Sequence, residues 1–245
     1  MSKIIALGGG DIRQRDTLKI DKEIIKLSGK SKPRLLFLPT ASSDSLGYIG
    51  DVKEYFGNFL GCRVSVLCLL NHQLTKQEIK NKILKTDIIY VGGGNTLKMM
   101  TLWRKLGVDK LLKEALKNNI VLCGISAGSI CWFEYGNSDS RKFTSNSKKL
   151  IKVSGLGFIQ AFHCPHYDAE AHRQKDLKRM MKLNPLISIA LENCCALEVV
   201  DDKFRILKSK KSAKAYKIYW KNKKYYKEII SEKVSFLPLK DLLSK

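Results

Sequence analysis

The sequence predicts an α/β protein in which a mostly parallel sheet is flanked by helices and the C-terminal region is rich in β-structure. Over the first two-thirds of the chain, short apolar runs alternate with amphipathic stretches, which is the pattern of βαβ units. The apolar runs lack strict alternation with polar residues, as expected of strands that are covered on both faces. Beyond residue 187, short β-type segments follow one another closely.

Strands are expected where Ile, Leu and Val concentrate, at residues 3–7, 34–38, 63–69, 87–91 and 120–123. The stretches between them carry apolar residues at steps of three and four, which is the spacing of one helix face. These stretches predict helices at residues 16–28, 45–60, 75–85 and 95–117. Thr75 followed by Glu78 gives the third of these helices a capping box.

After residue 132 the pattern is less regular. Residues 134–150 are polar and rich in turn formers, so we expect a long loop there, followed by a helix at about 169–182. Further strands are expected at 187–191, 196–200, 203–207, 214–220 and 224–230, with Lys221-Asn222-Lys223 as a hairpin turn. Because there is no internal repeat and no linker-like segment, we expect one domain over residues 1–245, with its β-rich part at about 187–230.

The net charge of +22 comes from 45 Lys and Arg against 23 Asp and Glu. Such an excess is typical of nucleic-acid-binding proteins. Here 36 of the 45 basic residues are Lys, whereas nucleic-acid recognition also recruits Arg. In residues 214–230 Lys alternates with aromatic residues, which favours a hairpin with its aromatic face on the core over a surface that stacks bases. We therefore expect a partner other than nucleic acid.

No apolar run approaches the roughly 20 residues that cross a bilayer, and the N-terminal run ends at Gly8. A cytoplasmic protein with no membrane partner is expected. The seven cysteines are odd in number and lack the spacing of metal ligands, so we expect reduced thiols. Neither a metal nor a cofactor is implied.

The most specific motif is Gly124-Ile125-Ser126-Ala127-Gly128, which directly follows an apolar strand. In a G-x-S-x-G turn between a strand and a helix, the serine Oγ projects from the chain and its small neighbours allow the tight turn. The backbone N–H of Ala127, at the start of the helix, is then placed to stabilise an oxyanion. Ser126 is therefore a candidate nucleophile, although a glycine-rich turn with a buried serine gives the same pattern.

A second glycine cluster, Gly92-Gly93-Gly94-Asn95, follows the strand at 87–91. A backbone N–H of this cluster is a candidate to complete the oxyanion hole, and Asn95 is a candidate to bind substrate. The cluster matches neither a P-loop nor the G-x-G-x-x-G pattern, which disfavours phosphate binding.

A serine nucleophile needs a base, and three of the four histidines follow Ser126. Pro165 stiffens the chain directly before His166, which makes His166 the candidate base.

Glu192, at the end of the strand at 187–191, is the preferred acid to orient the imidazole, and Asp139 and Glu198 are competitors. The order Ser, His, Glu differs from the Ser, acid, His order of α/β-hydrolases, which Asp139 as the acid would restore.

These motifs, in this order and approximate spacing, resemble peptidase family S51, which includes peptidase E, an α-aspartyl dipeptidase, and cyanophycinase. The resemblance spans about residues 1–230 and rests on the two glycine motifs, Cys164-Pro165-His166-Tyr167 and Leu191-Glu192. It implies a fold similar to class I glutamine amidotransferases, a flavodoxin-like sandwich. It also implies a catalytic triad of Ser126, His166 and Glu192, and an oxyanion hole from the backbone at Gly93 or Gly94 and Ala127.

The resemblance further implies a small peptide substrate with an N-terminal aspartate. By its offset from the histidine, Arg173 matches the family arginine thought to bind the aspartyl side chain, and a guanidinium suits that task. The segment between His166 and Arg173 departs from the family pattern because it is shorter and carries Asp168 and Glu170. Glu170 is a candidate for binding the substrate's α-amino group, unless both acids simply begin a helix.

The sequence thus predicts a serine exopeptidase of the peptidase E type that acts on short peptides. A cyanophycinase-like enzyme acting on β-aspartyl bonds would use the same triad. A non-catalytic, amidotransferase-like binding module with a basic surface is the alternative from another functional class.

Overall fold

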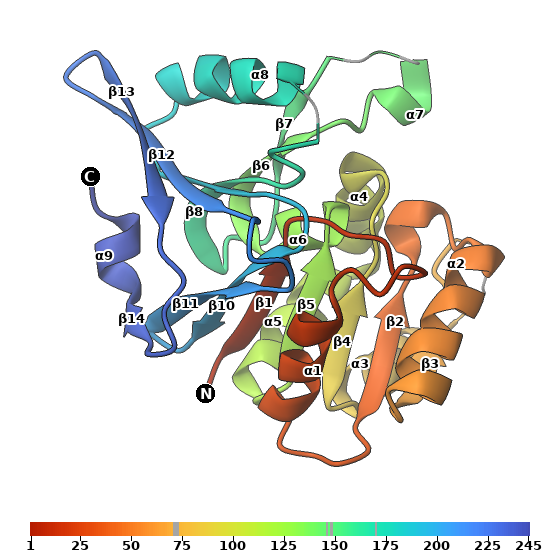
Figure 1. Cartoon of the computed structure of the whole chain (residues 1–245). Helices are drawn as coiled ribbons and strands as arrows, with labels where there is room; N and C mark the ends of the chain where they lie inside the picture. Colours follow the sequence, from red (N-terminus) through yellow and green to blue (C-terminus); the bar gives the residue numbers. More distant parts are fainter. Residues whose placement is uncertain (71–73, 146, 148, 170) are drawn as a thin grey trace.

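The computed structural model describes residues 1–70, 74–145, 147, 149–169 and 171–245. In this part of the chain, helices flank two β-sheets (Figure 1). The first sheet has the strand order β14-β11-β10-β1-β5-β4-β2-β3, and the second has the order β13-β12-β9-β8-β6-β7.

The elements of the N-terminal half are β1 (Lys3–Leu7), α1 (Leu18–Leu27), β2 (Arg34–Leu38), η1 (Thr40–Ser42), α2 (Leu46–Val52), η2 (Lys53–Phe59), β3 (Arg63–Val66), α3 (Lys76–Leu84), β4 (Ile88–Val91), α4 (Thr96–Leu106), α5 (Val108–Lys117) and β5 (Val121–Ile125). Those of the C-terminal half are α6 (Ala127–Ile130), β6 (Phe133–Ser138), α7 (Lys142–Ser145), β7 (Ile151–Ser154), β8 (Ile159–Cys164), α8 (Ala171–Lys182), β9 (Ser188–Leu191), β10 (Cys195–Val200), β11 (Lys203–Lys208), β12 (Ala215–Lys221), β13 (Lys224–Ile230), β14 (Leu237–Pro238) and α9 (Leu239–Leu243).

The first sheet confirms the predicted α/β class. Strands β1, β5, β4, β2 and β3 are parallel neighbours, and β10, β11 and β14 extend the sheet in antiparallel fashion. Successive strand residues face opposite layers: Ile5 packs with α1 and α2, whereas Ile4 packs with the cluster that includes α4 and α5. Both faces are therefore buried, which explains the continuous apolar runs.

The second sheet stands beside the carboxyl ends of the central strands and is covered by α8 (Figure 1). Strands β6, β8 and β9 run parallel to one another, while β7, β12 and β13 are antiparallel to their neighbours. Leu177 and Met181 of α8 pack against Phe162, Ala190 and Ile218 of the sheet.

Three sequence expectations were wrong. The segment at 134–150 contains most of β6 and all of α7, and the strands β7 and β8 were not anticipated. Because β6 lies between β7 and β8, its polar residues are hydrogen-bonded on both sides by the sheet ladder. The expected helix at 95–117 is two helices, since the chain turns at Gly107 with φ of 74°.

The predicted C-terminal hairpin is confirmed by β12 and β13. Asn222 and Lys223 both have positive φ, as the central residues of a type I′ turn require. Tyr216, Trp220 and Tyr225 pack in the α8 cluster, so these aromatic residues of the hairpin face the core, whereas Tyr219 and Tyr226 stack on each other. The Lys227 ammonium lies 4.3 Å from the centre of the Tyr216 ring and covers it.

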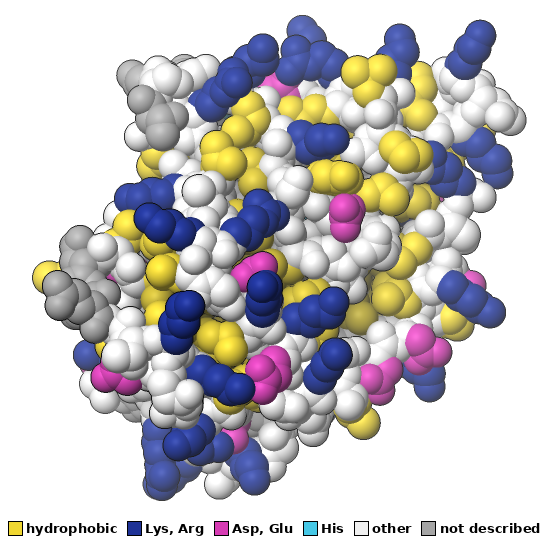
Figure 2. All heavy atoms as spheres, turned by 180° about the vertical axis from the view of Figure 1, so that it is seen from behind, with side chains coloured by type: hydrophobic (Ala, Val, Ile, Leu, Met, Phe, Trp, Pro, Cys, Tyr) yellow, Lys and Arg dark blue, Asp and Glu magenta, His cyan; other side chains and the backbone are white. Residues whose placement is uncertain are grey.

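On the face that Figure 2 shows, Lys and Arg side chains are spread between hydrophobic and other side chains rather than gathered in one patch. Within the described residues, no helix combines the length and the apolar character needed to cross a bilayer.

Candidate active site

Strand ends from both sheets meet where the sequence motifs lie. Three successive backbone carbonyls at the end of β1 accept hydrogen bonds from the converging segments. The Leu7 carbonyl accepts the N–H of Ser126 at 3.2 Å, and the Gly8 carbonyl accepts that of His166 at 2.9 Å. The Gly9 carbonyl accepts that of Cys194 at 2.8 Å. Ser126 and His166 are therefore hydrogen-bonded through their backbones to two adjacent residues, Leu7 and Gly8. The carboxyl ends of parallel strands are the usual place for ligand sites in α/β folds.

Ser126 adopts a backbone conformation that a side chain rarely takes. It has φ of 58° and ψ of −115° at the turn between β5 and α6. A Cβ on Gly128 would overlap the backbone carbonyl of Val91, and a Cβ on Gly124 would overlap that of Gly128. The two glycines are therefore required for α6 to pack tightly under β4 and β5, and this packing holds Ser126 in its strained turn.

The two candidate oxyanion donors lie on either side of Ser126. Ala127 is the first residue of α6, so its N–H has no partner within that helix. Gly93 lies close to the serine, because a Cβ built on it would be 3.8 Å from Ser126 Oγ. The Gly93 N–H donates toward the Tyr48 hydroxyl. Gly94 has φ of 135° and lies against the backbone of Ala41.

His166 is hydrogen-bonded to Asn193. Its Nδ1 lies 2.7 Å from Asn193 Oδ1. Because an amide oxygen only accepts, this contact requires a proton on Nδ1 and leaves Nε2 of the neutral imidazole as a base. Burial lowers the pKa of His166, and the bond from Nδ1 to Asn193 opposes this effect in part. A Cβ on Gly9 would overlap both side chains, so only glycine fits there.

Glu192 does not occupy the position that the sequence reasoning gave it. Its carboxylate accepts the backbone N–H of Lys214 at 2.8 Å and the Tyr216 hydroxyl at 2.9 Å, both on the β12 side. Glu192 follows the last residue of β9, and Asn193 lies in the turn that comes next. In this turn Asn193, and not Glu192, contacts His166. The sequence expectation was therefore displaced by one residue.

The other acids lie around this centre. Asp168 Oδ1 accepts the backbone N–H of Asn193 at 2.9 Å, and the charges of Asp168 and Asp139 both raise the pKa of His166. The other competitor, Glu198, is fully buried in β10 and is bonded to Arg205. Asn193 is thus held by Asp168 through its backbone while its side chain holds His166.

Arg173 lies on α8 with 3% of its surface exposed. Its Nη1 donates to the backbone carbonyl of Asn137 at 3.4 Å, and its Nη2 lies 4.0 Å from Asp139 Oδ2. The positive charge of Arg173 contributes to lowering the pKa of both His163 and His166, which places it within electrostatic reach of the site.

The side chain of another expected substrate residue, Asn95, is engaged elsewhere. Asn95 caps α4: its Oδ1 accepts the N–H of Lys98 at 3.0 Å and its Nδ2 donates to the Ser140 carbonyl at 3.4 Å. The side chain of Asn95 is thus occupied by capping, which corrects its assignment to substrate. Glu170 lies outside the described residues.

His163 is buried, and both of its ring nitrogens have partners within the protein. It is fully buried, its Nδ1 lies 2.9 Å from the Ile189 carbonyl, its Nε2 lies 2.8 Å from Ser129 Oγ, and its ring stacks on Phe133. Burial lowers the pKa of His163 to about 3, so this imidazole is neutral at ordinary pH.

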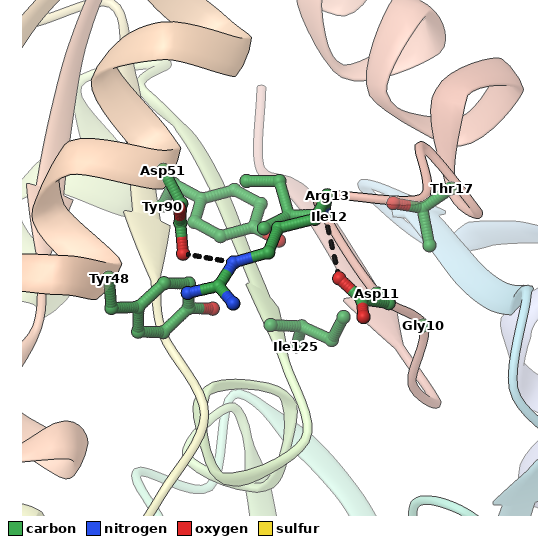
Figure 3. Close-up of a pocket in the computed structure, with 9 residues that line it drawn as sticks. All are labelled: Gly10, Asp11, Ile12, Arg13, Thr17, Tyr48, Asp51, Tyr90 and Ile125. Carbon is green, nitrogen blue, oxygen red and sulfur yellow. Dashed lines mark hydrogen bonds and ion pairs between the residues drawn. The ribbon is translucent and has the colours of Figure 1, made fainter.

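A cavity of about 340 Å³ lies beside Ser126 and is lined by Gly10, Asp11, Ile12, Arg13, Thr17, Tyr48, Asp51, Tyr90 and Ile125 (Figure 3). We call it the Arg13 cavity. Sequence reasoning did not find it, because its walls come from a loop, a helix and two strand ends that only the fold brings together. Among the described residues, no group of three or more His, Cys, Asp or Glu side chains could hold a metal ion.

Known proteins are similar to this chain in sequence and in fold. The model of peptidase family S51 matches residues 4–207. The chain is 39% identical over 221 residues to the uncharacterized peptidase YgaJ of Bacillus subtilis (strain 168), which covers 89% of this chain and 92% of that protein. It is 28% identical over 144 residues to the uncharacterized peptidase Lmo0363 of Listeria monocytogenes, covering 58% of this chain and 68% of that protein.

Two crystal structures have a similar fold. A proposed peptidase E protein from Listeria monocytogenes EGD-e matches 85% of this chain and 98% of its own with a TM-score of 0.65 and 21% identity. A peptidase from an acI-B1 Actinobacterium matches 97% of each chain with a TM-score of 0.73 and 16% identity.

Proposed function

Because the chain belongs to peptidase family S51, we propose that it is a serine exopeptidase that removes an N-terminal residue, preferably aspartate, from short peptides in the cytoplasm. The observation that carries this proposal is the strained turn at Ser126, with φ of 58°, at the start of a helix and beside His166. A buried structural serine has no need of such a turn, whereas a nucleophile needs its Oγ projected from the chain.

In this proposal Ser126 Oγ attacks the scissile carbonyl and its proton passes to Nε2 of His166. His166 then gives this proton to the leaving amine, and water releases the acyl group by the reverse path. Asn193 keeps the proton on Nδ1 and fixes the ring, a role that an amide also performs in the Cys-His-Asn arrangement. Asn193 therefore replaces Glu192 as the third member.

The oxyanion that forms during attack requires two N–H donors. We assign the Ala127 N–H, at the start of α6, and an N–H from Gly93 or Gly94. For Gly93 to act, the substrate oxygen must replace the Tyr48 hydroxyl as the acceptor of its N–H.

We assign Arg173 to the aspartyl carboxylate of the substrate. A nearly buried guanidinium close to His166 suits an anionic side chain, and the substrate carboxylate would take the place of Asp139, which lies 4.0 Å away, beyond hydrogen-bonding distance. The net charge of +22 would also attract acidic peptides, with an on-rate that falls as salt rises.

The test is the rate of amino-acid release from dipeptides that begin with Asp, Glu, Ala or Leu, together with a β-aspartyl dipeptide. We expect Asp to be preferred, and Arg173→Met to lower kcat/KM for Asp far more than for Ala. Arg179→Met is the matched control, because Arg179 lies on the same helix but is exposed and pairs with Asp176. An unchanged preference for Asp over Ala in Arg173→Met would show that Arg173 does not bind the aspartyl carboxylate. If wild type cleaves the β-aspartyl dipeptide faster than the α-aspartyl dipeptide, the enzyme is specific for β-aspartyl bonds instead.

A further inference from the structure

The Arg13 cavity contains a guanidinium that is held at one end. Arg13 Nε donates to Asp51 Oδ2 at 2.9 Å, and the Arg13 backbone N–H donates to Asp11 Oδ1 at 2.8 Å. In Figure 3 the terminal nitrogens extend from Asp51 toward Tyr48 and Ile125. Among the described residues, Asp51 is the acid that pairs with this guanidinium, which leaves the two terminal nitrogens for a ligand.

The Arg13 cavity adjoins the reacting groups. Ile125 in its wall precedes Ser126, and Gly10 follows Gly9, which packs against the His166 imidazole. Tyr48 in its wall accepts the N–H of Gly93. A peptide whose carbonyl lies at Ser126 therefore has one end within reach of this cavity.

The cavity has the chemistry of a site for a small amino acid. A guanidinium offers two parallel N–H donors that match a carboxylate, and Arg13, whose side chain is 69% exposed at the cavity, pairs with Asp51 through Nε. Ile12, Tyr48, Tyr90 and Ile125 provide apolar walls. A volume of about 340 Å³ lies at the lower end of the range for small-molecule sites.

We propose that the Arg13 cavity binds the leaving residue of a dipeptide and that Arg13 pairs with its free α-carboxylate. This inference rests on the proposed peptidase function, in which the acyl residue lies toward Arg173. The leaving amine must lie near His166, which protonates it, and the cavity begins at Gly10, the residue after the Gly9 that packs against this imidazole. The pairing would make the enzyme prefer dipeptides over longer or blocked peptides.

The test compares Asp-Leu with Asp-Leu amide, which lacks the carboxylate. We expect wild type to prefer the acid, and Arg13→Met to lower the ratio of kcat/KM for acid over amide by about tenfold. Arg13→Lys should keep part of the preference. Arg15→Met is the control, because Arg15 lies on the same loop but its guanidinium stacks 3.8 Å over Phe59 and does not line the cavity.

An equal loss on acid and amide in Arg13→Met, or no preference in wild type, would overturn the inference while leaving the peptidase function intact. If Arg13→Met instead loses the preference for an N-terminal Asp, the cavity binds the acyl residue and the inference is also wrong. Calorimetric titration of Ser126→Ala with Asp-Leu and with Asp-Leu amide measures the same preference as a difference in binding affinity. Absence of hydrolysis of either peptide by wild type would be the failure of the proposed function itself.

Discussion

His166 Nδ1 lies 2.7 Å from Asn193 Oδ1, while the carboxylate of the preceding residue, Glu192, points away to β12. The turn that follows β9 thus decides which of two adjacent residues orients the imidazole. An amide holds the tautomer without adding a charge, so the base keeps a low pKa.

This arrangement predicts that Asn193→Ala lowers kcat/KM by about 100-fold, because the imidazole loses the acceptor that fixes its ring and its tautomer. Glu192→Gln should change kcat/KM by less than about threefold, since an amide can still accept at one of the two contacts. Steady-state kinetics on one peptide with both variants checks this. A larger loss in Glu192→Gln than in Asn193→Ala would restore Glu192 as the orienting residue.

The pH dependence of kcat/KM provides a second prediction. The base must be neutral, and burial lowers the pKa of His166, so activity should persist below pH 6.5, the ordinary value for histidine. Asn193→Asp puts a negative charge beside the ring and raises that pKa, so the acid limb should move up by about one pH unit. Rate profiles from pH 4 to 9 show the shift. A limb that stays in place would mean that a group other than His166 sets it.

The glycine at the base of the turn should tolerate no side chain. In Gly128→Ala the new methyl group meets the Val91 backbone, which cannot move without disturbing the sheet, so we expect a loss of about 1–3 kcal/mol in unfolding free energy and a loss of activity. Gly47→Ala in α2 is the control, because nothing lies within 4 Å of its new methyl group. Urea unfolding should show Gly47→Ala as stable as wild type or slightly more stable. Equal stability of the two variants would contradict the tight packing of α6.

Asp21 predicts a pH dependence of stability. It is fully buried and accepts bonds from the Thr17 and Tyr55 hydroxyls at 2.8 Å each, and burial raises its pKa to about 7 from 3.8. The native state therefore holds a proton that the unfolded chain releases between pH 4 and 7, so stability falls as pH rises through that range.

Asp21→Asn keeps the two acceptor contacts and removes the titration. The unfolding free energy of this variant minus that of wild type should be larger at pH 8 than at pH 4 by up to about 4 kcal/mol. Chemical denaturation at both pH values measures the gain. A difference between variant and wild type that does not change with pH would show that Asp21 is not titrating in this range.

Local patterns predicted most of the first sheet. Strands β1 and β2 begin and end at the expected residues, and the capping box at Thr75 is present, because such features depend on neighbours in the sequence. The second sheet was partly missed, because β6 is stabilised by pairing with β7 and β8 rather than by its own polar sequence.

The candidate site shows the same division. The turn at Ser126 was predicted, because a strand followed by G-x-S-x-G is a local signal. Asn193 was missed in favour of Glu192, because the turn after β9 that brings Asn193 to His166 is not a pattern that the local sequence shows. Arg13 gave no signal, since its meeting with Asp51 joins residues 38 positions apart.

The central claim is that Ser126 is the nucleophile. Its most direct test is the rate of Asp-Leu hydrolysis by wild type and by Ser126→Ala, after circular dichroism and thermal unfolding show that both are folded. The account predicts that the variant loses at least about 1,000-fold in kcat. Equal turnover by the two proteins would contradict it.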